Sequence, residues 1–68
     1  REGVVVVDIT ILADGTCGEV RVVEDAPDPA FREAVLAAVR TWKFQPAVRG
    51  GHPVESVQRF RFVFRMQR

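Results

Sequence analysis

The chain opens with two segments in which apolar residues recur with the period of a β-strand. In the first, from Val4 to Leu12, every second residue is apolar, and valines on the opposite face indicate a central strand of a sheet. Asp14-Gly15 is a turn signal, because this pair tolerates the positive φ that a hairpin needs. A second strand is predicted from Glu19 to Glu24, with Val20 and Val22 facing inward. The core face of the first strand would consist of Val5, Val7, Ile9 and Ile11.

The last part of the chain shows the strictest alternation. A third strand is predicted from Ser56 to Met66, with aromatic residues on one face and mainly arginine on the other. Burying one phenylalanine stabilises a fold by roughly 1.5–3 kcal/mol. The aromatic face is therefore expected to meet a helix, and the arginine face to meet water or a partner. The first face holds Phe60, Phe62, Phe64 and Met66, and the second holds Arg59, Arg61, Val63 and Arg65.

One amphipathic segment of helical period lies between the second and third strands. Asp28 is suited to cap this helix and Pro29 to occupy its first turn. Apolar residues follow at the spacing of a single stripe as far as Trp42, and Pro46 prevents any continuation. We expect Trp42 and Phe44 to anchor the helix exit in the core. The predicted stripe comprises Phe31, Ala34, Val35, Ala38, Val39 and Trp42.

The order of these segments predicts an α+β fold of the β-β-α-β type. Arg49-Gly50-Gly51-His52-Pro53 is predicted to be a loop that joins the helix exit to the last strand. A crossover through the helix can place the last strand beside the first. We therefore expect a three-stranded antiparallel sheet in the order second-first-third, with one helix packed on one face. Residues 1–68 would form one small domain.

Composition narrows the possible classes of protein. Hydrophobic residues make up 47% of the chain, and the longest apolar run, Val4 to Val7, is far too short to cross a bilayer. The net charge of +1 gives no strong field for nucleic acid or for a membrane surface. The single cysteine, Cys17, cannot form an internal disulfide. A domain of 68 residues is expected to be marginally stable, with support from a partner, a homodimer or neighbouring sequence.

Residues that carry catalytic or metal chemistry are sparse. His52 is the only histidine and has no cysteine or carboxylate at ligand spacing. Ser56 and Cys17 have no base near them in the sequence. Gly50-Gly51 precedes a strand rather than a helix, so the geometry of a phosphate-binding loop is missing. We therefore expect no enzymatic activity, no metal and no cofactor.

The last strand is the candidate functional element. At the border of the sheet it would present unpaired N–H and C=O groups, which can accept an extended peptide. Its arginines have three interpretations: they keep the edge soluble, they contact a peptide, or they contact the phosphates of a nucleic acid. Nucleic acid is disfavoured because no aromatic residue alternates with the arginines on their own face. The predicted peptide-binding residues are Val57, Gln58, Arg59, Phe60, Arg61, Phe62, Val63 and Phe64.

A set of motifs, in this order and at these spacings, resembles the C-terminal domain of TonB-type energy transducers. The resemblance extends from Gly3 to about Phe64, nearly the whole chain. Its closest part is Trp42-Lys43-Phe44-Gln45-Pro46-Ala47, followed by the phenylalanine-rich strand. The other matching segments are Gly3-Val4-Val5-Val6-Val7, Asp14-Gly15, the helical run from Phe31 to Val39, and Gly51-His52-Pro53-Val54.

The resemblance implies a periplasmic domain of a Gram-negative envelope, whose parent protein has an inner-membrane helix and a Pro-rich spacer. In that family the third strand pairs with the TonB box, a short peptide near the N-terminus of an outer-membrane transporter. Inner-membrane motor partners supply energy from the proton-motive force. By position, the box-binding strand here would be Val57 to Phe64. The alternative is a TonB-like domain of another envelope machine, such as a gliding-motility or signalling protein, with a different partner.

Overall fold

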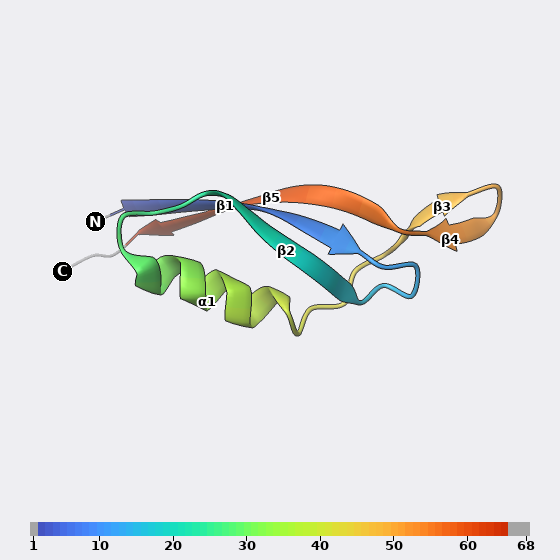
Figure 1. The fold of residues 1–68 in the computed structure, drawn as a ribbon, viewed down its shortest axis with the longest axis horizontal. Helices are drawn as coiled ribbons and strands as arrows, with labels where there is room; N and C mark the ends of the chain where they lie inside the picture. The colour runs from blue at the N-terminus through green and yellow to red at the C-terminus, as the bar shows by residue number, and fades with distance from the viewer. Residues whose placement is uncertain (1, 66–68) are drawn as a thin grey trace.

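The computed structural model describes residues 2–65, which form a three-stranded antiparallel sheet with one helix lying along one face (Figure 1). The predicted α+β class and the position of the last strand beside the first are confirmed. The prediction for Met66 lies outside the described residues. The large sheet has the order β2-β1-β5, and its strands are β1 (Glu2–Ile11), β2 (Cys17–Glu24) and β5 (Ser56–Arg65). The other elements are α1 (Pro29–Val39), β3 (Ala47–Arg49) and β4 (His52–Val54).

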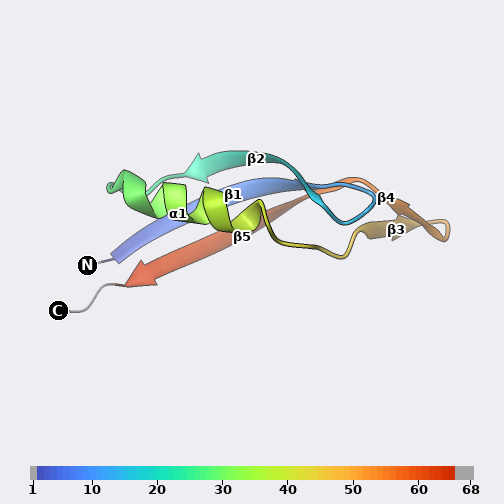
Figure 2. The same cartoon turned by 90° about the horizontal axis from the view of Figure 1, so that it is seen from below.

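Strand β1 occupies the centre of the sheet, as its apolar residues on both faces predict. It pairs with β5 over ten consecutive positions, from Glu2 opposite Arg65 to Ile11 opposite Ser56, and with β2 on its other side. Its helix-facing residues pack in one cluster with Val35 and Val39 of α1, which lies across the sheet in Figure 2. The buried residues of β1 on this face are the predicted set, Val5, Val7, Ile9 and Ile11.

Helix α1 begins as predicted but ends earlier. The backbone N–H of Ala30 donates a hydrogen bond to Asp28 Oδ1 at 3.0 Å, and Pro29 occupies the first turn. The last helical residue is Val39, and the N–H of Trp42 donates to the Val39 carbonyl at 3.1 Å in a tight closing turn. The apolar stripe therefore continues beyond the helix itself.

Trp42 is not the buried core anchor that the pattern predicts. It is 40% exposed, and its ring lies against those of Phe44 and Phe62, with centroid distances of 6.1 and 5.8 Å. The segment after the helix is instead held by the backbone of Phe44, whose N–H donates a hydrogen bond to the Gly15 carbonyl at 2.8 Å. Gly15 has a φ of 87°, and a Cβ there would lie 2.5 Å from the Phe44 carbonyl oxygen, so this contact requires glycine.

The pairing of β2 with β1 is irregular at two points, and the extra residues belong to β2. Val23 has no partner on β1 at one point, and Gly18 and Glu19 lie together opposite Thr10 at the other. Such bulges disrupt the ladder and increase the local twist. Val23 lies exposed, because alternation after the inward-facing Val20 and Val22 places it on the outer face of the sheet.

The predicted loop over Arg49–Pro53 is wrong, because these residues belong to a second hairpin. β3 and β4 pair from Ala47 opposite Val54 to Arg49 opposite His52. Gly50 and Gly51 both have positive φ, 57° and 81°, as a two-residue hairpin turn with the twist of its strands requires. This hairpin projects beyond the end of the main sheet and lengthens the molecule to 49 × 18 × 17 Å (Figure 1).

Candidate functional site

All the residues predicted to bind a peptide lie on β5, which is an end strand of the sheet. In the order β2-β1-β5, one side of β5 pairs with β1 and the other pairs with no strand among the described residues. Its ladder with β1 has no register shift over ten pairs. The strand therefore offers a regular row of backbone groups without a bulge. The residues concerned are Val57, Gln58, Arg59, Phe60, Arg61, Phe62, Val63 and Phe64.

The side of β5 that faces the helix is aromatic. Phe60, Phe62 and Phe64 are half-buried and pack against the core, as predicted. Each contacts a ring from the helix or its exit: Phe60 with Phe44 at 5.7 Å, Phe62 with Trp42 at 5.8 Å, and Phe64 with Phe31 at 4.9 Å between centroids. These three ring contacts pack β5 against the helix and its exit.

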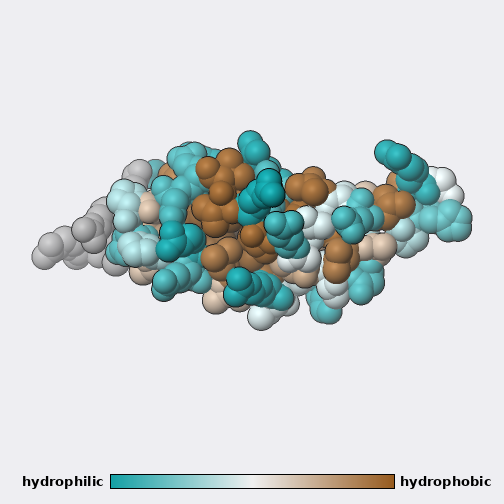
Figure 3. Space-filling model, viewed as in Figure 1, coloured by the Kyte–Doolittle hydropathy of each residue, from teal (hydrophilic) through white to brown (hydrophobic). Residues whose placement is uncertain are grey.

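The opposite side of β5 is cationic and partly apolar. Arg59 and Arg61 are exposed there, between Val57 and Val63, which are 64% and 48% exposed. Figure 3 shows apolar side chains in the middle of one view of the molecule, interrupted by hydrophilic ones, and a further group over the β3–β4 hairpin. On the outer side of β5 itself, the two exposed valines flank the two exposed arginines.

The cationic side contains one well-defined ion pair. Arg59 Nε donates to Asp8 Oδ1 at 2.8 Å and Arg59 Nη2 donates to Asp8 Oδ2 at 3.1 Å, a two-point contact between residues opposite each other in the ladder. These hydrogen bonds lower the pKa of Asp8 below its ordinary value and raise that of Arg59. Arg21, opposite Asp8 on the other neighbouring strand, adds a smaller electrostatic effect in the same direction.

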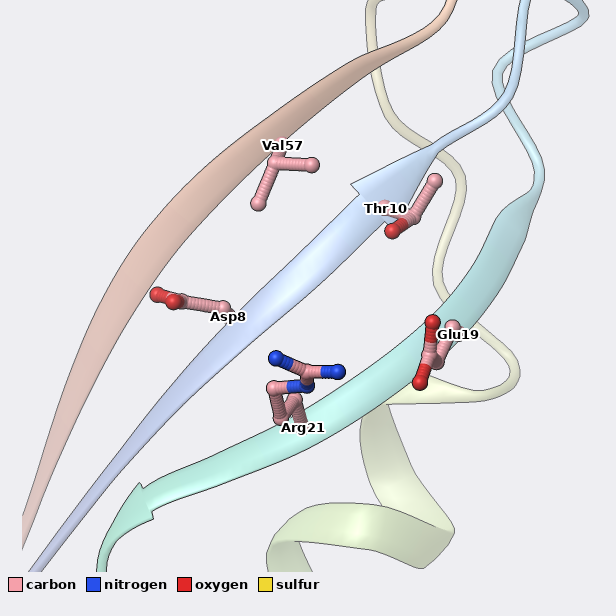
Figure 4. Close-up of a pocket in the computed structure, with 5 residues that line it drawn as sticks. All are labelled: Asp8, Thr10, Glu19, Arg21 and Val57. Atoms are coloured by element: carbon pink, nitrogen blue, oxygen red, sulfur yellow. The ribbon is translucent and has the colours of Figure 1, made fainter.

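A shallow hollow of about 130 Å³ lies on this same face, beside the ion pair. Figure 4 shows that its side chains come from three adjacent strands, β5, β1 and β2. It is an open depression with charges of both signs. The sequence reasoning missed it, although Asp8 was visible as the one charged residue in the strand from Val4 to Leu12. The lining residues are Asp8, Thr10, Glu19, Arg21 and Val57.

The sequence also offered one histidine and one cysteine as candidates for metal or nucleophilic chemistry. His52 lies exposed in β4 of the projecting hairpin, and Cys17 is half-buried, with its thiol donating to the Gly18 carbonyl at 3.6 Å. Within residues 2–65 the side chains form no cluster of ligands suited to a metal ion. No helix within residues 2–65 combines the length and the apolar character needed to span a membrane.

Fold and edge together define a small α+β domain with an open, regular end strand. A family model for the Gram-negative bacterial TonB protein C-terminal region matches residues 1–66, and the chain belongs to this family. The chain is 34% identical over 67 residues to Protein TonB of Pseudomonas aeruginosa. That alignment covers 98% of this chain and 20% of the relative, so the chain spans about a fifth of the relative's length. The predicted resemblance to TonB C-terminal domains is therefore confirmed.

Proposed function

We propose that this domain is the peptide-binding, periplasmic part of a TonB-like energy transducer. In this proposal it binds the TonB box of an outer-membrane transporter by adding that peptide to β5 as a further strand. Family membership supports the kind of protein. The single observation that carries the mode of binding is that β5 forms an unbroken ladder with β1 on one side and, within residues 2–65, pairs with no strand on the other.

The second edge of the sheet is a poorer candidate for the same role. β2 has eight residues against ten in β5, and its pairing with β1 is shifted at two points. Bulges re-aim backbone groups and twist an edge away from an added strand. β5 has no such irregularity, so successive peptide residues can bind in a constant register.

An added peptide would meet two different surfaces. Side chains on alternate positions would lie beside the aromatic row of Phe60 and Phe62 or beside Arg59 and Arg61. Backbone hydrogen bonds would supply the register. A strand of six to eight residues would form an interface below about 1,200 Å², in the range of transient complexes with roughly micromolar affinity.

The wider role requires parts of the parent protein outside this chain. We propose that the parent is anchored in the inner membrane and that inner-membrane motor partners act through those other parts. Energy derived from the proton-motive force would then reach the transporter through the peptide held on β5. The domain itself needs no catalytic residue for this role.

Amide chemical-shift mapping tests the proposed site. The labelled domain is titrated with a synthetic eight-residue peptide that spans the TonB box of a transporter from the same bacterium. The largest shifts are expected along Val57–Phe64. Shifts restricted to α1 or to Gly50 and Gly51 would refute addition to this edge.

A backbone-methylated pair of peptides gives a matched control. In an extended strand, alternate amides point toward the same neighbour. Methylation of one alternate set should therefore abolish binding, whereas methylation of the other set should largely preserve it. Equal loss or equal retention for both peptides would show that binding does not use a β-ladder.

A further inference from the structure

The arginines on the outer side of β5 are not equivalent, because one is already neutralised within the domain. Two guanidinium nitrogens of Arg59, Nε and Nη2, donate to the two carboxylate oxygens of Asp8, at 2.8 and 3.1 Å. Bidentate geometry of this kind fixes the guanidinium and satisfies the carboxylate at the same time. An incoming carboxylate beside Arg59 would have to compete with Asp8.

Arg61 has no such partner among the described residues. Its neighbour across the ladder is Val6, which carries no charge. The acidic residue beyond Val6 is Glu24 on β2, two strand spacings from β5, or about 9–10 Å. No hydrogen bond or ion pair of Arg61 exists within residues 2–65. Arg61 is exposed and has its charge available to a ligand at the free edge.

We propose that Arg61 is the specificity-determining residue of the β5 edge, and that it selects extended peptides carrying a carboxylate directly beside it. The inference rests on the proposed strand addition and specifies the ligand further. Directly opposed residues on neighbouring strands have Cβ atoms about 4.5–5.5 Å apart, within reach of a glutamate and an arginine. Val63, two positions along on the same side, is exposed and favours an apolar or β-branched residue beside it.

Two designed peptides test this selection. Both are acetylated and amidated eight-residue peptides in which valine and threonine alternate, with glutamate at one central threonine position in the first and glutamine in the second. Binding of each is measured by amide shift titration at low salt. The glutamate peptide is expected to bind the parent domain about threefold to fivefold more tightly than the glutamine peptide. The difference should shrink as salt is added.

Variants of the domain distinguish the effect of Arg61 on peptide preference from the effect of the other charges on this face. Arg61→Gln should abolish the preference for glutamate, because it weakens binding of the glutamate peptide more than binding of the glutamine peptide, and Arg61→Lys should restore part of the preference. The double variant Asp8→Asn/Arg59→Gln removes the internal pair as a neutral unit and should keep the full preference. Each side chain is exposed or partly exposed, and circular dichroism verifies that the variants fold.

The outcomes distinguish the inference from the function on which it rests. If both peptides shift β5 amides but Arg61→Gln leaves their ratio unchanged, edge binding stands and the role of Arg61 is refuted. If the double variant loses the preference for glutamate as completely as Arg61→Gln does, the role of Arg61 is also refuted. The preference would then depend on several charged residues of this face. If neither peptide shifts β5 amides, strand addition fails and the inference fails with it. If a single-stranded oligonucleotide displaces the peptides from the parent domain but not from Arg61→Gln, Arg61 is assigned to phosphate binding instead.

Discussion

The rings of Phe31 and Phe64 stack almost parallel, with centroids 4.9 Å apart and an interplanar angle of 13°. Phe31 belongs to the first part of α1 and Phe64 to the last part of β5, so the contact joins two elements that are far apart in the sequence. Gly3 on β1 lies opposite Phe64, and a Cβ on Gly3 would be 2.5 Å from Cδ2 of Phe31. The stacked pair therefore depends on a glycine in the neighbouring strand.

Gly3→Ala is expected to destabilise the domain by about 1–3 kcal/mol, because the new methyl group must displace the ring of Phe31. Urea unfolding measures the change. In the Phe31→Leu background the same substitution should cost less, since the clashing ring is gone. An equal cost in both backgrounds would mean that the backbone, and not the ring, requires glycine here.

Trp42→Ala is expected to cost only ~1–2 kcal/mol, below the range for a fully buried aromatic residue. The reason is its 40% exposure and its position beyond the helix. Ile9→Ala, at a fully buried position of β1, should cost more, about 2–5 kcal/mol. Chemical denaturation of the two variants side by side gives the comparison. A larger loss for Trp42→Ala would restore this residue as the principal anchor.

Stability should depend on pH through Asp8. Hydrogen bonds from Arg59 hold the pKa of Asp8 below its ordinary value of 3.8. Because the folded state favours the ionised form, the contribution is present in full above the unfolded pKa and is lost as pH falls through the lower folded pKa. The stability difference between the parent and Asp8→Asn should therefore be present at neutral pH and should disappear in strong acid. A difference that stays constant over this range would contradict the linkage.

Carbon NMR titration of the carboxyl groups gives an independent check on Asp8. In Arg59→Gln the pKa of Asp8 should rise toward its ordinary value, because its main hydrogen-bond donor is lost. Asp14 is the internal control. Its pKa is lowered by hydrogen bonds from Thr16, so Arg59→Gln should leave it unchanged. Equal movement of both groups would indicate a general effect of net charge.

Self-association is expected at high concentration. The edge of β5 is unpaired among the described residues, and Val23, Val57 and Val63 are exposed on or near the same face. Sedimentation at millimolar concentration, with a reducing agent to exclude cross-linking through Cys17, measures it. Val63→Lys should weaken the association by adding charge at the edge. A strict monomer under these conditions would refute the prediction.

The sheet and its order follow from sequence because their signals are strong and local. Alternation from Val4 to Leu12 and from Ser56 onward determines which face of each strand meets the helix. The stripe on α1 then covers the face that carries Val5, Val7, Ile9 and Ile11. These features depend on burial, which the hydrophobic pattern records directly.

The features that escaped prediction depend on contacts rather than on pattern. The β3–β4 hairpin has exposed residues on both short strands, so no alternation reveals it. The helix ends at Val39 although its stripe continues, and the hydrogen bond from Phe44 to Gly15 that follows it joins residues far apart in the sequence. The Asp8–Arg59 pair joins residues 51 positions apart and required the strand register to be known.

The unbroken pairing of β1 with β5 has a mechanical consequence for the proposed function. The chain enters β1 at the end of the molecule where β5 finishes, as Figure 1 shows. Tension applied there along the strand axis, and resisted by a peptide on β5, loads the ten paired positions in shear, so they share the force simultaneously. Tension from the side would instead open the same ladder one pair at a time. The resistance of the domain would therefore depend on direction. The β1–β5 ladder would withstand a pull along the 49 Å axis and would open readily under a transverse pull.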